Sequence, residues 1–292
     1  MLRSVFVLVA SVCLSCALFA ADAPYPLRDA VEFHPRGGIP NVLAKLNEGK
    51  EVHIAYLGGS ITAAPGWRVK TLKWFQDQYP KAKVSEINAA IGGTGSDLGV
   101  YRVEFDALRH KPDLMFVEFA VNDGGAEPAR IHQAMEGIVR QAWKSDPNMD
   151  ICYVYTLTDK MLPDLQGGKF PRAASAMEAL ADFYAIPSIH MGVEVAKMEK
   201  EGTLIFKAPE PKTDAEKKAL NGKMVFSSDG VHPLVWSGHE IYLNVVSRSV
   251  TDMKAVGAVG KHDLKAPMVA DNFENARILP LDKAKLSAGW EK

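Results

Sequence analysis

Three residues from two distant parts of the chain have the types that covalent acyl transfer needs. Ser60 offers a hydroxyl, His232 an imidazole and Asp229 a carboxylate. A serine hydroxyl is a weak nucleophile unless a neighbouring base removes its proton, and a histidine can do so near neutral pH. A carboxylate beside the histidine fixes its tautomer and stabilises its charged form. We therefore expect Ser60 to be the nucleophile, His232 the base and Asp229 its partner.

The tetrahedral intermediate of such a reaction also needs hydrogen-bond donors for its negatively charged oxygen. Ser60 and Gly93 can each supply a backbone N–H, and Asn122 can supply a side-chain amide. Gly93 suits this role because a residue without a side chain lets a substrate approach its backbone. We expect these three residues to form the oxyanion hole.

The elements that must position these residues alternate between strand and helix. Apolar runs predict strands, and apolar residues at helical spacing predict helices. The expected strands are 52–57, 83–88, 114–119, 151–155 and 186–189, and the expected helices are 41–47, 67–78, 98–110, 129–143, 170–184, 193–200 and 234–256. This alternation predicts an α/β fold, a three-layer α/β/α sandwich around a five-stranded parallel, flavodoxin-like sheet. Open parallel sheets bind ligands at the carboxyl ends of their strands, where the candidate residues fall.

The combination of motifs resembles the SGNH hydrolase superfamily, also called GDSL-type esterases, over about residues 52–256. The resemblance is carried by Gly58-Gly59-Ser60-Ile61-Thr62, Asn88 to Gly93, Val121-Asn122-Asp123 and Asp229-Gly230-Val231-His232. It implies that Ser60, Gly93, Asn122 and His232 are the four residues that give the superfamily its name, and that Asp229 completes a catalytic triad.

One position departs from the family pattern. Gly59 precedes the serine, where the name GDSL implies an aspartate. The change alters the hydrogen bonds of the turn but removes no catalytic group. We expect Asp123 to be a structural turn residue, because aspartate readily bonds to nearby backbone groups in turns.

Four further residues are candidates for substrate binding, namely Trp67, Arg68, Arg102 and Trp236. Aromatic rings can stack on sugar rings, and arginine can bind carboxylates. The default interpretation of the first two is that Trp67 packs in the core and that Arg68 is solvated or ion-paired, and substrate binding is the alternative.

Composition excludes several classes of partner. The chain has 292 residues, 34 Lys and Arg against 35 Asp and Glu, and this balance gives no electrostatic field that would attract nucleic acid or an anionic membrane.

The histidines are not spaced as a metal site, and the loop Gly92-Gly93-Thr94-Gly95 lacks the Lys-Ser/Thr of a phosphate loop. We expect no cofactor and no metal. The oligomeric state stays open.

The first residues predict export. Arg3 precedes an apolar run over 5–21 that ends in small residues, which is typical of a cleaved secretory signal. A membrane anchor or a lipoprotein segment is the alternative. We expect a signal peptide over 1–23, a lead-in over 24–50, a hydrolase domain over 51–256 and an extension over 257–292. The extension either packs on the core or begins a truncated accessory region.

These observations predict a secreted or periplasmic serine esterase that removes O-acetyl or other short acyl groups from carbohydrate. Its partner would be a glycan or small-molecule ester, with no membrane contact after signal cleavage. The preference for carbohydrate is implied by the resemblance, because Gly-Gly-Ser-Ile-Thr followed by Gly-Trp-Arg is typical of family members linked to glycan breakdown. The alternatives are a lipid-directed esterase, thioesterase or lysophospholipase, a non-catalytic glycan-binding protein, and an acyl transferase.

Overall fold

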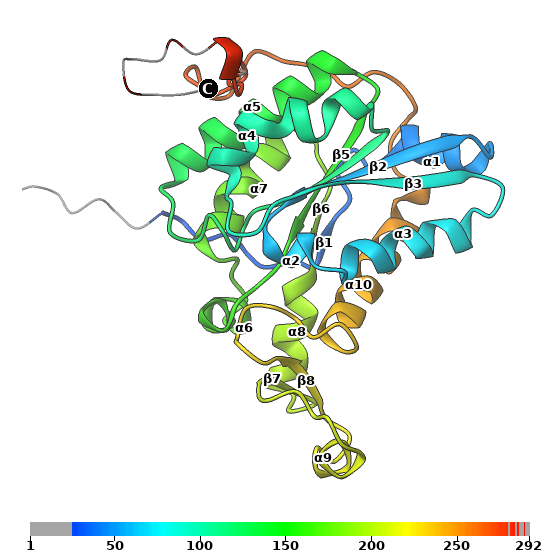
Figure 1. Ribbon diagram of the computed structural model, residues 1–292, viewed down its shortest axis with the longest axis vertical. Coiled ribbons are helices and arrows are strands. Elements are labelled where there is room, and N and C mark those ends of the chain that lie inside the picture. Colours follow the sequence, from blue (N-terminus) through cyan, green and yellow to red (C-terminus); the bar gives the residue numbers. More distant parts are fainter. Residues whose placement is uncertain (1–24, 280, 284, 286–288, 290–292) are drawn as a thin grey trace, which may run out of the picture.

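The computed structural model describes residues 25–279, 281–283, 285 and 289 and is built around one central sheet (Figure 1). The expected signal peptide over 1–23 lies outside the described residues. The sheet has six strands in the order β1-β6-β5-β4-β2-β3. Their bounds are β1 (Phe33–His34), β6 (Ser188–His190), β5 (Asp150–Tyr155), β4 (Leu114–Glu118), β2 (Glu51–Gly58) and β3 (Lys83–Ala90).

Five of these strands, β2 to β6, are parallel and have the flavodoxin-like order. This confirms the predicted fold class. The sixth strand, β1, was not predicted, and it pairs antiparallel with β6 at the edge of the sheet. A strand of two residues is too short to show alternating polarity, so no sequence pattern could indicate it.

Helices cover both faces of the sheet. On one face lie α4 (Ser96–Asp106), α5 (Pro128–Ser145) and α7 (Arg172–Tyr184), and on the other lie α3 (Trp67–Gln78), α8 (Met191–Lys200) and α10 (Gly238–Asp252) (Figure 1). The shorter helices are α1 (Pro40–Asn47), α2 (Ser60–Ala63) and α6 (Leu162–Gln166), with 3₁₀ turns at Leu108–His110, Asp159–Met161, Met253–Ala255 and Leu281–Lys283. No helix among the described residues is long and apolar enough to cross a bilayer.

The hydrophobic pattern explains why these layers form. All five residues of β4 are buried, as a strand covered on both faces requires. Helix α5 buries one apolar stripe that includes Ile131, Met135 and Ile138, and this stripe packs toward the sheet. The last helix begins later than predicted, at Gly238 instead of Leu234, because Leu234 donates its N–H to Phe226 O.

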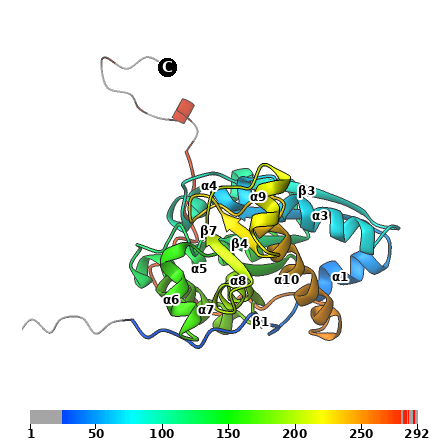
Figure 2. The same cartoon turned by 90° about the horizontal axis from the view of Figure 1, so that it is seen from below.

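A small arm projects beyond the main sheet. It consists of β7 (Leu204–Lys207), α9 (Asp214–Ala219) and β8 (Met224–Ser227), and the two strands pair in parallel (Figures 1 and 2). The sequence analysis predicted no strand or helix between residues 200 and 234. The arm matters for the site because β8 leads directly into the segment that carries Asp229 and His232.

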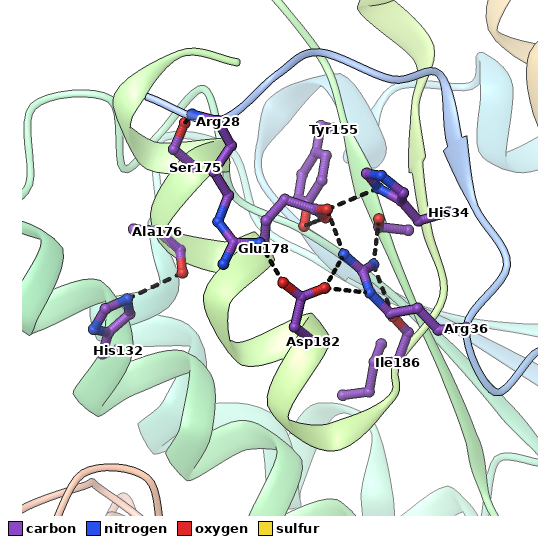
Figure 3. A network of polar contacts seen from close by, with 11 residues as sticks. Arg28, His34, Arg36, His132, Tyr155, Ser175, Ala176, Glu178, Asp182 and Ile186 are labelled. Atoms are coloured by element: carbon purple, nitrogen blue, oxygen red, sulfur yellow. Dashed lines mark hydrogen bonds and ion pairs between the residues drawn. The ribbon is translucent and has the colours of Figure 1, made fainter. Parts of the chain in front are cut away.

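The lead-in residues are fixed to α7 by a buried polar network (Figure 3). The carboxylate of Glu178 is fully buried and receives His34 Nδ1 at 2.9 Å, Arg36 Nη2 at 2.5 Å and the Tyr155 hydroxyl at 2.8 Å. Burial opposes the charge of Glu178, but the bonds from His34 and Arg36 outweigh it and lower the pKa to about 2. Arg28 and Arg36 also pair with Asp182 on the same helix.

The segment after α10 runs along α5. Met268 and Val269 donate their N–H groups to Glu136, and Phe273 donates to Gln133 O at 3.0 Å. Glu274 forms ion pairs with residues of the same helix, Arg140 and Lys144.

Candidate active site

Ser60 is the first residue of α2, and one residue, Gly59, separates it from the end of β2. The turn is crowded on the side of Gly59. A Cβ atom at Gly59 would lie 2.1 Å from Asn122 Oδ1, so only glycine fits while Asn122 keeps its position. The Asn122 side chain occupies the space that a side chain at residue 59 would need.

The structure brings Ser60, His232 and Asp229 into a hydrogen-bonded series. Ser60 Oγ lies 2.8 Å from His232 Nε2, although 172 residues separate them in the chain. His232 Nδ1 lies 2.7 Å from Asp229 Oδ2. The histidine therefore faces a hydroxyl with one ring nitrogen and a carboxylate with the other, as a general base positioned by an acid requires.

The Asp229 carboxylate is held in place from several sides. Its Oδ1 accepts the backbone N–H groups of Val231 and His232, both at 2.8 Å, and the Ser227 hydroxyl at 2.9 Å. Burial acts to raise the pKa of Asp229, but the hydrogen bonds from the His232 ring and from these backbone groups outweigh it and hold the pKa well below its usual range. Asp229 therefore stays ionised beside the imidazole at neutral pH.

The two remaining oxyanion candidates lie next to Ser60. A Cβ atom at Gly92 would lie 3.6 Å from Ser60 Cβ, which places the loop of Gly93 against the serine. Gly93 itself has φ +74° and open space where its side chain would be. The Asn122 side chain lies against Gly59, and Gly93 and Asn122 line the same cavity of about 560 Å³. Two of the three donors of the predicted hole, Gly93 and Asn122, therefore border one space.

A sequence model of the GDSL-like Lipase/Acylhydrolase family matches residues 56–234, which is more than half of the chain. The chain belongs to this family. The resemblance seen in the four motifs is thereby confirmed, and the match spans all five candidate residues, from Ser60 to His232.

Solved structures share the fold of this family member. A two-domain esterase, described as active on acetylated mannans and crystallised with mannopentaose, is 24% identical with a TM-score of 0.65, over 86% of this chain and 62% of that chain. The chain thus spans less than two thirds of that protein. A protein from Parabacteroides merdae, described as a GDSL-like lipase, is 16% identical with a TM-score of 0.51, over 69% of this chain and 96% of that chain. No curated protein matches the sequence.

A buried carboxylate that the sequence analysis missed supports the serine turn of this family member. Glu118, at the end of β4, is 1% exposed and accepts the hydroxyls of Thr62 at 2.9 Å and Thr156 at 2.7 Å. The backbone of Gly59 also bonds to it. Burial raises the pKa of Glu118, while these hydrogen bonds oppose the rise. A charged residue that ends an otherwise apolar strand was the signal available in the sequence.

Asp123 has the structural role that was expected of it. Its Oδ1 accepts the Ser96 N–H at 2.9 Å, at the first turn of α4. The residue is buried, and this burial raises the pKa of its carboxyl to about 6. Asp123 therefore ties the turn of Asn122 to the helix that follows the Gly93 loop.

Three of the four predicted substrate-binding residues are buried, so that prediction is corrected for them. Trp67 is fully buried, with its ring 5.4 Å from that of Tyr56 and 5.9 Å from that of Phe116. Arg68 is 5% exposed, donates to Thr62 O and forms an ion pair with Glu86. The core and ion-pair interpretation holds for this pair because both side chains point inward from α3.

Arg102 is the third buried candidate, and it is 2% exposed. Its guanidinium donates to Ala89 O, to Gly58 O at 3.2 Å and to the Thr94 hydroxyl at 3.3 Å, and it pairs with Asp106. Arg102 thus joins the ends of β2 and β3 to the glycine-rich loop and has no face turned to a substrate. Its role is to hold the loop of Gly93.

Trp236 differs from the other three because it is 42% exposed. Its indole N–H donates to Glu210 of the arm at 2.9 Å. A role for Trp236 in substrate binding stays a prediction.

Two cavities lie next to the site, although neither Ser60 nor His232 is among the residues that line them. The first is lined by Gly93 and Asn122, and the second, of about 530 Å³, by Val121 and Val231, which precede Asn122 and His232 in the chain. Both also have charged walls: Asp97, Glu127 and Arg130 in the first, and Asp159, Lys160, Asp164 and Arg172 in the second. Among the described residues, no three His, Cys, Asp or Glu side chains are grouped to hold a metal ion. Residues next to Ser60 and His232 therefore border two cavities with polar walls.

Proposed function

We propose that this protein is a serine esterase that removes O-acetyl or other short acyl groups from carbohydrate. The observation that carries the proposal is the hydrogen-bonded series from Ser60 Oγ through His232 to Asp229, with steps of 2.8 and 2.7 Å. Three groups of these types at these distances are what nucleophilic acyl transfer needs. Membership of a lipase and acylhydrolase family supports the same reaction.

In the first half of the reaction, His232 Nε2 takes the proton of Ser60 Oγ while the oxygen forms a bond to the ester carbonyl carbon. The electron pair of the carbonyl moves to its oxygen, where the N–H groups of Ser60 and Gly93 and the Asn122 amide stabilise the charge. The intermediate then collapses. The sugar oxygen leaves with the proton from His232, and the acyl group stays on Ser60.

In the second half, water takes the place of the sugar. His232 removes a proton from the water as its oxygen attacks the acyl carbon, and then returns that proton to Ser60 Oγ as the acid departs. Asp229 stays ionised throughout and stabilises the imidazolium that forms in each half. A sugar hydroxyl in place of the water would make the same site an acyl transferase.

Carbohydrate fits the flanking cavities better than a lipid tail. Their walls carry carboxylates and arginines, which a hydroxylated ligand can bind and an acyl chain would have to desolvate. The structural similarity to an esterase described as active on acetylated mannans points to the same class of substrate.

The test combines two measurements on the purified protein. Acetate release is measured from a panel of acetylated glycans, and turnover is measured on nitrophenyl esters of increasing acyl length. We expect acetate release that is lost in Ser60→Ala, and a rate that falls as the acyl chain lengthens. A preference for long chains would assign the lipid-directed alternative. Failure of a fluorophosphonate to label Ser60, with glycan binding intact, would assign a non-catalytic binding protein.

We propose further that the protein acts outside the cytoplasm after removal of residues 1–23. The support is the charged start, apolar run and small-residue end of this segment. The N-terminus of the protein recovered from the periplasm or medium of an expressing bacterium should begin near residue 24. An uncleaved N-terminus in the membrane fraction would instead indicate an anchor.

A further inference from the structure

The cavity that contains Gly93 and Asn122 extends away from the serine between α4, α5 and the segment after α10. Its far wall includes Tyr101 of α4 and Phe273 of the C-terminal segment. A substrate whose ester carbonyl rests on the oxyanion donors has the rest of its body beside this space. The cavity is therefore positioned to contact a part of the substrate that takes no part in the reaction.

Two aromatic rings in this wall form an accessible surface. Tyr101 is 41% exposed, and its ring centroid lies 6.2 Å from that of Phe273, with the planes tilted by 40°. An aromatic ring with one open face can stack on the apolar C–H face of a sugar. Neither residue was singled out from the sequence, because Tyr101 lies on a helix and Phe273 lies in a segment without any motif.

Charged side chains line the cavity together with the rings. They are Asp97, Glu127 and Arg130, and all three are exposed. Carboxylates accept hydrogen bonds from hydroxyl groups, and a guanidinium donates them. A pocket with aromatic faces and a few polar groups at its edge suits a sugar ring, whereas an acyl chain would leave the charged groups without partners.

The wall is fixed to the core, although it comes from the end of the chain. Ile278 donates its N–H to Tyr101 O at 3.2 Å, and Gln141 Nε2 donates to Phe273 O at 3.2 Å. A Cβ atom at Gly137 would lie 2.7 Å from the Phe273 carbonyl carbon, so the glycine lets the segment approach α5 closely. A preformed wall lowers the entropy cost of binding.

We propose that Tyr101 and Phe273 form a subsite that binds a sugar ring of the glycan next to the acylated position. This inference rests on the proposed function and deepens it. It assigns the C-terminal segment a role in substrate recognition, and it names an oligosaccharide, not a monosaccharide or a lipid, as the substrate.

The test compares Tyr101→Ala with Phe105→Ala. Phe105 is also an exposed aromatic residue on α4, one turn further along, and it does not line the cavity. Values of kcat/KM are measured for an acetylated manno-oligosaccharide and for nitrophenyl acetate, which carries no sugar ring. We expect Tyr101→Ala to lower the ratio of the two values by about fivefold or more, the size of one aromatic contact. Phe105→Ala should leave the ratio as in the wild type.

Phe273 is partly buried, so its replacement by alanine could loosen the segment. Phe273→Leu keeps most of the apolar volume and removes the ring, and it should lower the same ratio with little change in the unfolding midpoint. Equal losses on both substrates, or an unchanged ratio in Tyr101→Ala, would overturn the subsite while leaving the esterase intact. A wild-type protein that hydrolyses neither ester would overturn the proposed function and the subsite with it.

Discussion

At the scale of single residues, the contact between Gly59 and Asn122 is the tightest point of the site. Asn122, the proposed oxyanion donor, lies against Gly59, and a Cβ at residue 59 would approach its Oδ1 to 2.1 Å. We therefore expect a side chain at residue 59 to affect the reaction through Asn122.

Asn122→Ala should lower kcat by about 10²- to 10³-fold, the loss typical of one missing oxyanion donor. KM should change little, because the charge on the oxygen develops only in the transition state. The measurement is steady-state turnover of nitrophenyl acetate, with thermal unfolding as the control for folding. A kcat close to the wild-type value would remove Asn122 from the oxyanion hole.

Gly59→Ala should reduce kcat by about tenfold or more, because the new methyl group displaces the amide of residue 122. If displacement of Asn122 is the cause, the double variant Gly59→Ala with Asn122→Ala should be no slower than Asn122→Ala alone. Coupling of this kind is expected of residues in direct contact. Strictly additive losses would show that Gly59 acts by another route.

The sequence was sufficient to predict which residues meet at the site, but not which way every side chain points. Ser60, Gly93, Asn122, Asp229 and His232 could be found because each follows a strand or precedes a helix at one edge of a parallel sheet. The burial of Arg102 could not be found in this way, because an arginine on a helix can face either the core or the solvent, whereas core packing of Trp67 was one of two interpretations that the sequence left open.

At the scale of elements, Glu118 links three segments around the serine. Its carboxylate bonds to Thr62 in α2 and to Thr156 after β5, and it lies at the end of β4 itself. It touches none of the reacting groups, so we treat it as a positioning residue for the turn that carries Ser60.

Glu118→Ala should lower kcat on nitrophenyl acetate by about tenfold or more, because misplacement of a nucleophile by a fraction of an ångström is costly. Glu118→Gln should restore most of the rate, since an amide of the same size can still bond to both threonine hydroxyls. KM should be similar in all three proteins. A wild-type kcat in Glu118→Ala would show that the turn does not depend on this carboxylate.

The positions of the main helices and strands could also be predicted, whereas those of the arm and of the edge strand β1 could not. Helix α3 begins and ends where the apolar spacing placed it, at Trp67 and Gln78. The strands β7 and β8 have four residues each and flank a polar stretch, so their pairing depends on contacts that no local pattern encodes. The late start of α10 has the same kind of cause, a backbone bond from Leu234 to Phe226.

At the scale of the whole molecule, the Glu178 network joins the lead-in to α7 and should make stability depend on pH. In the folded protein, the bonds from His34 and Arg36 lower the pKa of Glu178 from its ordinary value of 4.5 to about 2. Its contribution is therefore fully present above about pH 4.5 and is lost as the pH falls toward 2. A difference of this size corresponds to about 3 kcal/mol.

Urea unfolding of wild type and Glu178→Gln between pH 7 and pH 3 measures this contribution. The wild type should be the more stable protein at pH 7, and the gap should narrow steadily below about pH 4.5. The exposed Glu201→Gln is the control and should show a small gap at every pH. A gap for Glu178→Gln that stays constant with pH would contradict the ionised state assigned to this side chain.

The two-residue strand β1 has a consequence for how copies of the protein meet. Strand β6 is buried on both faces, and β1 occupies its outer backbone groups. Without Phe33 and His34, those groups would become a template on which a strand of another molecule could add. The opposite border, β3, alternates in exposure, with Lys83 and Glu86 among its polar residues, and resists such addition by charge. Deletion of the N-terminal residues up to and including residue 34 should therefore favour self-association before it impairs the chemistry at Ser60.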